Sequence, residues 1–168
     1  MSSTQAAWSE YVRRHNPELG AGHDLDAFLF GTDRAALHQL AEPLPDLQNG
    51  RCFYTGRALD PADAHVDHFV PWAKYPLNSP FNLVVASNSA NLQKSDHLAA
   101  LPHLERWIER LHLQSDGLLE LDGLPRDVGR TIEIARFSYS QAERLHALGW
   151  LRGRDMQDLT GWQQVLGA

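Results

Sequence analysis

The amino-acid sequence predicts an α+β fold in which a small core of two strands and one helix lies between helical flanks. Residues 64–70 alternate apolar with polar side chains, residues 82–86 are mainly apolar, and both stretches have the length of strands. A short helix pattern follows at 88–94, and amphipathic helix patterns occupy most of the remaining chain. The chain has 168 residues, of which 43% are hydrophobic and 21% charged, and this composition excludes a disordered protein.

The N-terminal residues 1–48 are predicted to be a helical extension of this core. One helix is expected over 5–14, because Asn16-Pro17 disfavours its continuation. Another is expected to begin near residue 32 and to run to residue 41, where the following prolines end it.

The central residues 49–100 hold the predicted core. Residues 51–54 are a further strand candidate, and 55–57 would turn the chain after them. Three prolines within 71–81 predict an irregular loop between the two main strands. Ser87 is placed to cap the helix that follows the second strand.

The C-terminal residues 101–168 are predicted to be helical, apart from a loop or weak hairpin at 117–123. The three helices are expected at 102–113, 127–148 and 155–166. We treat residues 1–168 as a single domain made of the N-terminal extension, the core and this C-terminal region.

The formal charge argues against a protein that binds nucleic acid by bulk electrostatics. Fifteen basic and 21 acidic residues give a net charge of −6, whereas such a protein is usually basic. Residues 51–97 carry four basic and four acidic groups and are therefore neutral. The core is the part of the chain that repels a phosphate backbone least.

Other features of the composition bear on location. No apolar run approaches the roughly 18 residues of a membrane span, and the N-terminus lacks the pattern of a secretory signal. Cys52 is the single cysteine, so the chain cannot form an internal disulfide. We expect a cytoplasmic protein with no membrane partner.

Polar residues suited to metal-assisted hydrolysis gather in residues 64–94. Asp67 and His68 end the first strand and must face opposite sides of it, while Asn82 opens the second strand and Asn91 lies on the helix. Carboxylate and amide oxygens suit Mg²⁺, which completes its octahedron with waters and phosphate oxygens. An imidazole beside the metal can take a proton from water, and the Asn82 amide is placed to orient that imidazole.

Each of these residues also has an ordinary interpretation. His68 could be a core or surface histidine, Asp67 a strand-end cap, Asn82 a strand opener and Asn91 a solvated helix residue. The candidates for contacts to substrate are Lys94, Arg51, Arg57, Lys74 and His65, with solvated side chains as the alternative.

At these positions the sequence resembles the HNH endonuclease family, whose core is the ββα-metal (His-Me finger) fold. The stretches that carry the resemblance are 65–71, 82–86 and 91–96, within about residues 50–100. They are similar to the variant in which asparagine replaces the last histidine of the family name. The resemblance implies that His68 is the general base, that Asn82 positions it, and that Asp67 and Asn91 hold one divalent metal. Mg²⁺ is the expected metal, with Mn²⁺ or Ni²⁺ as other possibilities.

One departure from the family pattern concerns structural zinc. Many HNH proteins carry two Cys-x-x-Cys pairs, but here the corresponding positions are Cys52 with Thr55 and Ser87 with Ala90. A four-thiolate zinc site is therefore excluded, and we expect no structural zinc. Apolar and hydroxyl packing must hold this corner of the core instead.

The resemblance implies a metal-dependent endonuclease that hydrolyses phosphodiester bonds in nucleic acid, with nicking of DNA expected. The negative net charge and the lost zinc ligands leave an alternative, a non-catalytic nucleic-acid-binding module. A third possibility is a subunit of a defence or repair complex, activated by a protein partner. The flanking helices would then dock that partner or a second copy of the chain.

Overall fold

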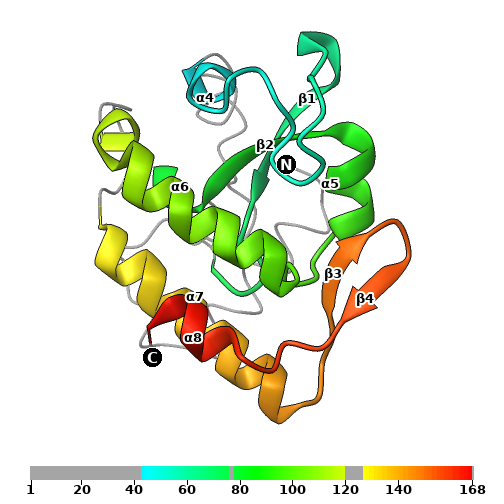
Figure 1. The fold of residues 1–168 in the computed structure, drawn as a ribbon, viewed down its shortest axis with the longest axis vertical. Coiled ribbons are helices and arrows are strands. Elements are labelled where there is room, and N and C mark those ends of the chain that lie inside the picture. The colour runs from blue at the N-terminus through cyan, green and yellow to red at the C-terminus, as the bar shows by residue number, and fades with distance from the viewer. Residues whose placement is uncertain (1–42, 76–77, 120–126, 168) are drawn as a thin grey trace, which may run out of the picture. The chain divides into compact units, whose positions relative to one another are not determined.

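The computed structural model describes residues 43–75, 78–119 and 127–167 (Figure 1). The chain divides into two units, Met1–Gln39 and Leu40–Ala168, and all described residues lie in the second. The helices predicted before residue 42 lie outside the described part, so the helical extension and the single domain stay predictions. No helix in the described ranges is long and apolar enough to cross a bilayer.

The predicted core of two strands and a helix is present. Strands β1 (Ala64–His68) and β2 (Leu83–Ser87) pair antiparallel, from Ala64 opposite Ser87 to His68 opposite Leu83. Helix α5 (Asn88–Lys94) follows directly and packs against both strands (Figure 1). The Ser87 hydroxyl accepts a hydrogen bond from the Ala90 amide and so caps α5, as predicted. The predicted α+β class is therefore confirmed.

The segment before β1 differs from the predicted strand at 51–54. After the short helix α4 (Pro43–Leu47), Arg51 and Ala58 form a single antiparallel bridge around a tight turn. The Cys52 amide donates to the Arg57 carbonyl, and Gly56 takes a positive φ of 68° that glycine adopts without strain. We call residues 51–58 the Cys52 turn. A 3-10 helix, η1 (Pro61–Asp63), then leads into β1.

The loop between β1 and β2 ends in a second 3-10 helix, η2 (Pro80–Asn82), whose three residues are all buried. Proline at its first position fixes a φ that suits a helical start. The Phe69 amide donates to the Asn82 carbonyl at 2.7 Å, which closes the base of the loop. The loop thus returns the chain to the position from which β2 can pair with β1.

Two long helices that follow the core in the sequence pack over it. Helix α6 (Leu101–Leu119) extends six residues beyond the end of the predicted helix 102–113. Residues 117–119, which were predicted to begin a loop, are therefore helical. The ring of its Trp107 stacks on Phe69 with centroids 4.7 Å apart, and the indole donates to the Phe81 carbonyl at 2.8 Å. Helix α7 (Val128–Arg144) packs near η2, and α8 (Trp162–Leu166) contacts both long helices.

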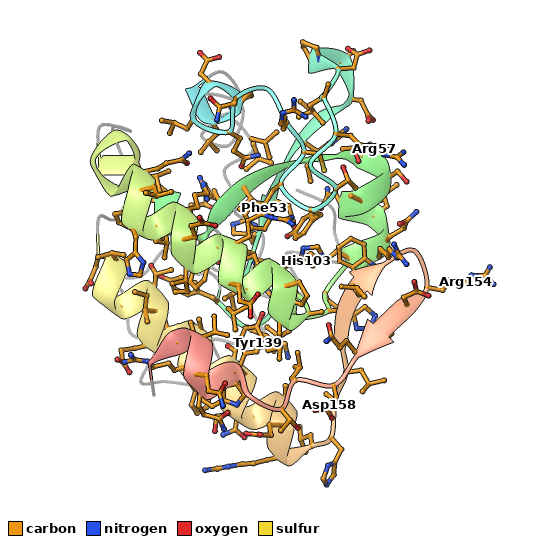
Figure 2. All side chains as sticks on the ribbon, in the orientation of Figure 1. Phe53, Arg57, His103, Tyr139, Arg154 and Asp158 are labelled. Atoms are coloured by element: carbon orange, nitrogen blue, oxygen red, sulfur yellow. The ribbon has the colours of Figure 1, made fainter. Side chains whose placement is uncertain are left out.

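The prediction that the C-terminal region is helical throughout is wrong for residues 149–157. There β3 (Gly149–Arg152) and β4 (Asp155–Gln157) form a hairpin, and Arg154 projects from its tip (Figure 2). Helix α7 consequently ends at Arg144 rather than residue 148. The cause is pairing with distant backbone, since the Trp150 amide donates to Leu98 and its carbonyl accepts from Ala100, each at 2.8 Å.

Candidate active site

Asp67 and His68 occupy the last two positions of β1, where the strand packs against the end of α5. Both side chains are largely buried, each with 9% of its residue surface exposed. Successive strand residues face opposite sides, so the carboxylate and the imidazole belong to two different environments. The structure therefore places the carboxylate and the imidazole on different sides of β1, as the sequence predicts.

The Asp67 carboxylate is held by two donors from other elements. The Tyr54 hydroxyl, from the Cys52 turn, donates to Oδ2 at 2.5 Å, and Lys94 Nζ lies 3.1 Å from the same oxygen. Burial and the neighbouring carboxylate raise the pKa of Tyr54, which therefore stays a protonated donor. Both contacts are made by the same carboxylate oxygen, Oδ2.

Lys94 does not lie where a substrate phosphate could reach it, contrary to its prediction as a substrate contact. The side chain is fully buried, and its ammonium also donates to the His68 carbonyl at 2.8 Å. Burial lowers the pKa of Lys94, while the Asp67 carboxylate acts in the opposite direction. The physical reason for the misplacement is its position in the last turn of α5, on the side that packs against β1.

The His68 ring is held by the loop that precedes β2. Its Nε2 lies 2.9 Å from Asn78 Oδ1, and the half-buried Trp72 ring meets it edge-on with centroids 5.2 Å apart. Burial lowers the pKa of His68, and the hydrogen bond to Asn78 and the charge of Asp67 partly oppose that effect. The imidazole is therefore a fixed group with one ring nitrogen engaged by the protein.

Asn82 makes a different contact from the one predicted. Its amide donates to the Val70 carbonyl at 2.9 Å and accepts from the Val70 amide at 2.8 Å. The fully buried side chain thus bridges the backbone two residues after His68 and does not bond the ring. The correction has a simple cause, because Asn82 ends η2 directly opposite the start of the loop, where two backbone groups need partners.

Asn91 lies half-buried on α5, three residues before Lys94 and hence on the same side of the helix. In the described part of the chain, no three histidine, cysteine, aspartate or glutamate side chains gather into a metal-binding group. The predicted ligands Asp67 and Asn91 would supply one carboxylate and one amide oxygen, both hard donors. Such a set fits a hard divalent cation that keeps most of its ligands as water or phosphate oxygen.

The remaining predicted substrate contacts are all on the surface. His65, Arg51, Arg57 and Lys74 are exposed, and Arg51 also donates to the Gly56 carbonyl at 2.9 Å within the Cys52 turn. Exposure is compatible with a contact to phosphate and equally with a solvated charge. Their role stays a prediction.

The corner that corresponds to the zinc site of many HNH proteins is held here by hydrogen bonds. Cys52 is buried, and its sulfur accepts from the Ser87 amide at 3.3 Å and lies 3.9 Å from the Ser87 hydroxyl. The thiol pKa is lowered from its usual range: burial acts to raise it, but contacts from Thr55, Ser87 and Tyr54 together outweigh burial. Hydrogen bonds from Ser87 thus surround the Cys52 sulfur at this corner.

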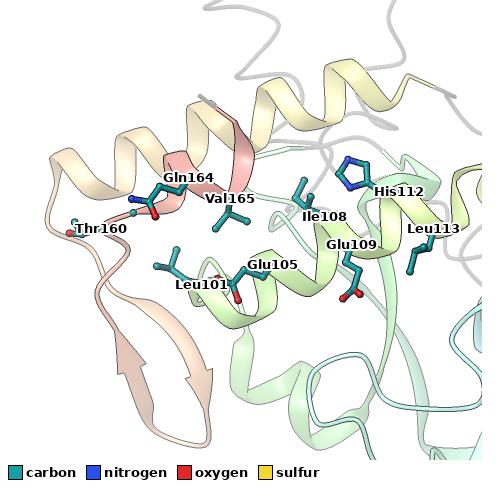
Figure 3. Close-up of a pocket in the computed structure, with 10 residues that line it drawn as sticks. Leu101, Glu105, Ile108, Glu109, His112, Leu113, Thr160, Gln164 and Val165 are labelled. Atoms are coloured by element: carbon teal, nitrogen blue, oxygen red, sulfur yellow. The ribbon is translucent and has the colours of Figure 1, made fainter.

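Two hollows lie outside the predicted site. One of about 560 Å³ runs between α6 and α8, with Leu101, Ile108 and Val165 as its apolar lining (Figure 3). The other, of about 780 Å³, is bounded by the Cys52 turn, α5 and β3, and includes Arg57 and Tyr54. Of the predicted site residues, only Arg57 lines either hollow.

Sequence reasoning missed Tyr54, which donates to the Asp67 carboxylate, and Asn78, which bonds the His68 ring. Tyr54 precedes Asp67 by 13 residues and Asn78 follows His68 by ten, and both lie outside regular structure. The sequence carries no signal that separates Tyr54 from the other residues of the Cys52 turn. Nor does it carry one for Asn78 among the other polar residues of its loop.

Comparison with known proteins identifies the core. Residues 52–100 match the family model described as HNH endonuclease. No curated protein matches the chain. The matched residues span the Cys52 turn, both strands, α5 and the segment that leads to α6. The family indicates nuclease-type hydrolysis of nucleic acid, generally with a divalent metal. Residues 52–100 of the chain are thus similar to the HNH endonuclease family.

Proposed function

We propose that the chain is a metal-dependent endonuclease that nicks DNA, with His68 as the general base. Asp67 and Asn91 would hold one divalent cation, most simply Mg²⁺. The observation that carries the proposal is the arrangement at the end of β1, where a fixed imidazole and a fixed carboxylate occupy successive residues beside α5.

The proposed chemistry follows from the separate surroundings of the His68 imidazole and the Asp67 carboxylate. His68 would take the proton of a water molecule, whose oxygen then attacks phosphorus in line with the leaving 3′-oxygen. The new bond is the one between the water oxygen and phosphorus, and the bond between phosphorus and the 3′-oxygen breaks. A divalent cation, when bound, would polarise the phosphoryl group and stabilise charge on the leaving oxygen. Asn82 would keep the backbone after His68 in place through Val70.

The test is cleavage of supercoiled plasmid by wild type and His68→Ala in Mg²⁺, in Mn²⁺ and in EDTA. We expect metal-dependent nicking by wild type and a loss of about 10²- to 10⁴-fold in His68→Ala, which is the usual range for a general base. His112→Ala is the matched control, because His112 is an exposed histidine of α6. A folded wild-type protein that cuts neither DNA nor RNA would refute the proposal.

The second candidate is a binding subunit that needs a partner or does not cleave. The net charge of −6 favours it, since neutral residues 51–97 provide little attraction for phosphate. Tight DNA binding in EDTA without cleavage in metal would support this alternative. Docking of a partner or a second copy through the flanking helices belongs to the same alternative and stays a prediction.

A further inference from the structure

The contact between His68 and Asn78 decides which nitrogen of the imidazole is basic. Asn78 offers its carboxamide oxygen, which can only accept, to Nε2 at a distance of 2.9 Å. With the carboxamide of Asn78 in this orientation, Nε2 carries the ring hydrogen. Because a neutral imidazole holds a single ring hydrogen, Nδ1 is left with a free lone pair.

Asn78 can have this effect only if its own loop is fixed, and a helix outside the HNH match fixes it. The next residue, Ser79, is buried, and its hydroxyl lies 3.1 Å from the hydroxyl of Thr131 in α7. The Thr131 hydroxyl donates to the Asp127 carbonyl at 3.0 Å, so it accepts from Ser79. The Ser79 carbonyl in turn accepts a hydrogen bond from the backbone amide of Asn82 at 2.8 Å.

We propose that Asn78 is a positioning residue that holds His68 as the tautomer whose basic nitrogen is Nδ1, and that Thr131 anchors it through Ser79. The inference rests on the proposed function, because a chosen tautomer matters only if His68 takes a proton. It assigns helix α7, which lies beyond the HNH match, a part in the site. Asn78 acts through His68 and does not touch the substrate.

The first test needs no activity. A long-range proton–nitrogen NMR spectrum of the metal-free full chain at about pH 8, where histidine is neutral, reports which ring nitrogen of each histidine is protonated. His68→Ala identifies the His68 signal by its absence. We expect a protonated Nε2 in wild type and an averaged mixture of tautomers in Asn78→Ala. A wild-type spectrum with the hydrogen on Nδ1 would overturn the inference.

The second test separates positioning from general stability. We expect Asn78→Ala to lower kcat about 10- to 100-fold, as loss of an orienting partner typically does, with KM nearly unchanged. Asn78→Asp keeps an acceptor for Nε2 and should restore the wild-type tautomer pattern, and Thr131→Val should shift kcat and the tautomer pattern in the direction of Asn78→Ala. Asn88→Ala, at an exposed asparagine of α5, is the matched control.

The outcomes distinguish this inference from the proposed function. An Asn78→Ala protein with wild-type kcat and a wild-type ring spectrum overturns the role of Asn78, whatever the chain cleaves. A wild-type protein without nuclease activity overturns the proposed function instead. In that case the ring spectra of the same samples still decide whether Asn78 holds the tautomer.

Discussion

At the scale of single residues, the fully buried Lys94 is the most consequential side chain of the core. Its ammonium bonds both the Asp67 carboxylate and the His68 carbonyl, and so ties the end of α5 to the end of β1. A buried ion pair adds little net stability, because both charges lose their hydration. Removing one partner is costly, however, because the other charge then stays buried without compensation.

We therefore expect Lys94→Met to lower the free energy of unfolding by about 3–5 kcal/mol. Urea denaturation followed by circular dichroism measures this change. Lys74→Met is the matched control, because Lys74 is the other lysine of the chain and is exposed. Adding Asp67→Asn to Lys94→Met should recover part of the loss. Equal effects of the Lys74 and Lys94 substitutions would contradict the buried pair.

His103 is expected to make the stability of the fold depend on pH. Its Nε2 donates to the Leu151 carbonyl at 2.7 Å, and its buried Nδ1 has no partner among the described residues. Burial lowers the pKa of His103, the positive charges of Arg106 and Lys94 act in the same direction, and the Leu151 contact opposes them. Below about pH 6.5 the unfolded chain therefore binds a proton that the folded chain resists.

Stability should consequently fall as pH drops below about 6.5 and through the lowered pKa of His103. We expect His103→Gln, which keeps a donor near Leu151, to lose less stability than wild type between about pH 8 and pH 5.5. Thermal melts at both pH values measure the difference. A wild-type melting temperature that drops no more than that of His103→Gln would show that this histidine is not the cause.

At the scale of elements, an amide side chain takes the place of a neighbouring strand beside β2. Gln48 follows α4, and its amide both donates to and accepts from Val85, each at 2.8 Å. The strand edge that faces away from β1 is thereby partly satisfied without a third strand. The Asn82 side chain bridges the amide and carbonyl of Val70 in the same way, just beyond the end of β1.

Replacing Gln48 by alanine should therefore destabilise the fold by about 1–3 kcal/mol, because the Val85 amide loses its partner. Gln93→Ala removes an exposed glutamine of α5 and should change stability little. Chemical denaturation of both variants provides the comparison. The interpretation fails if the two substitutions have the same effect.

The helices and strands differ in how far local sequence predicts them. The strands at 64–68 and 83–87 and the helix at 88–94 follow from local alternation, apolar runs and the Ser87 cap, and the structure has them within two residues. The hairpin at 149–157 could not be found in this way. Its strands are three or four residues long, and Trp150 is held by backbone some 50 positions earlier. Asp67 and His68 were identifiable by their motif, whereas Asn78 depends on a loop conformation.

At the scale of the molecule, the HNH segment depends on helix α6 for its backbone hydrogen bonds. Trp107, Arg106 and Arg110 donate to the carbonyls of Phe81, Phe53 and Leu83. Arg110 is buried, which lowers its pKa to about 10, yet it stays charged at neutral pH. These carbonyls belong to the matched residues 52–100, but their donors lie beyond them.

A fragment of residues 43–100 should therefore not fold, although it contains the whole family match. We expect no cooperative transition in urea for this fragment, and a cooperative transition for a fragment of residues 43–168. Circular dichroism and tryptophan fluorescence test both. Cooperative unfolding of the shorter fragment would show that the HNH segment is autonomous.

The Cys52 corner has a practical consequence for studying this molecule. In proteins that close the corner with thiolates, a chelator removes a structural ion together with any ion used in chemistry, and the two losses cannot be told apart. Here the Ser87 amide and hydroxyl occupy the surroundings of the lone sulfur. If the proposed hydrolysis requires a divalent metal, chelation should stop it and leave the fold intact, so that different metals can be compared in a single folded sample.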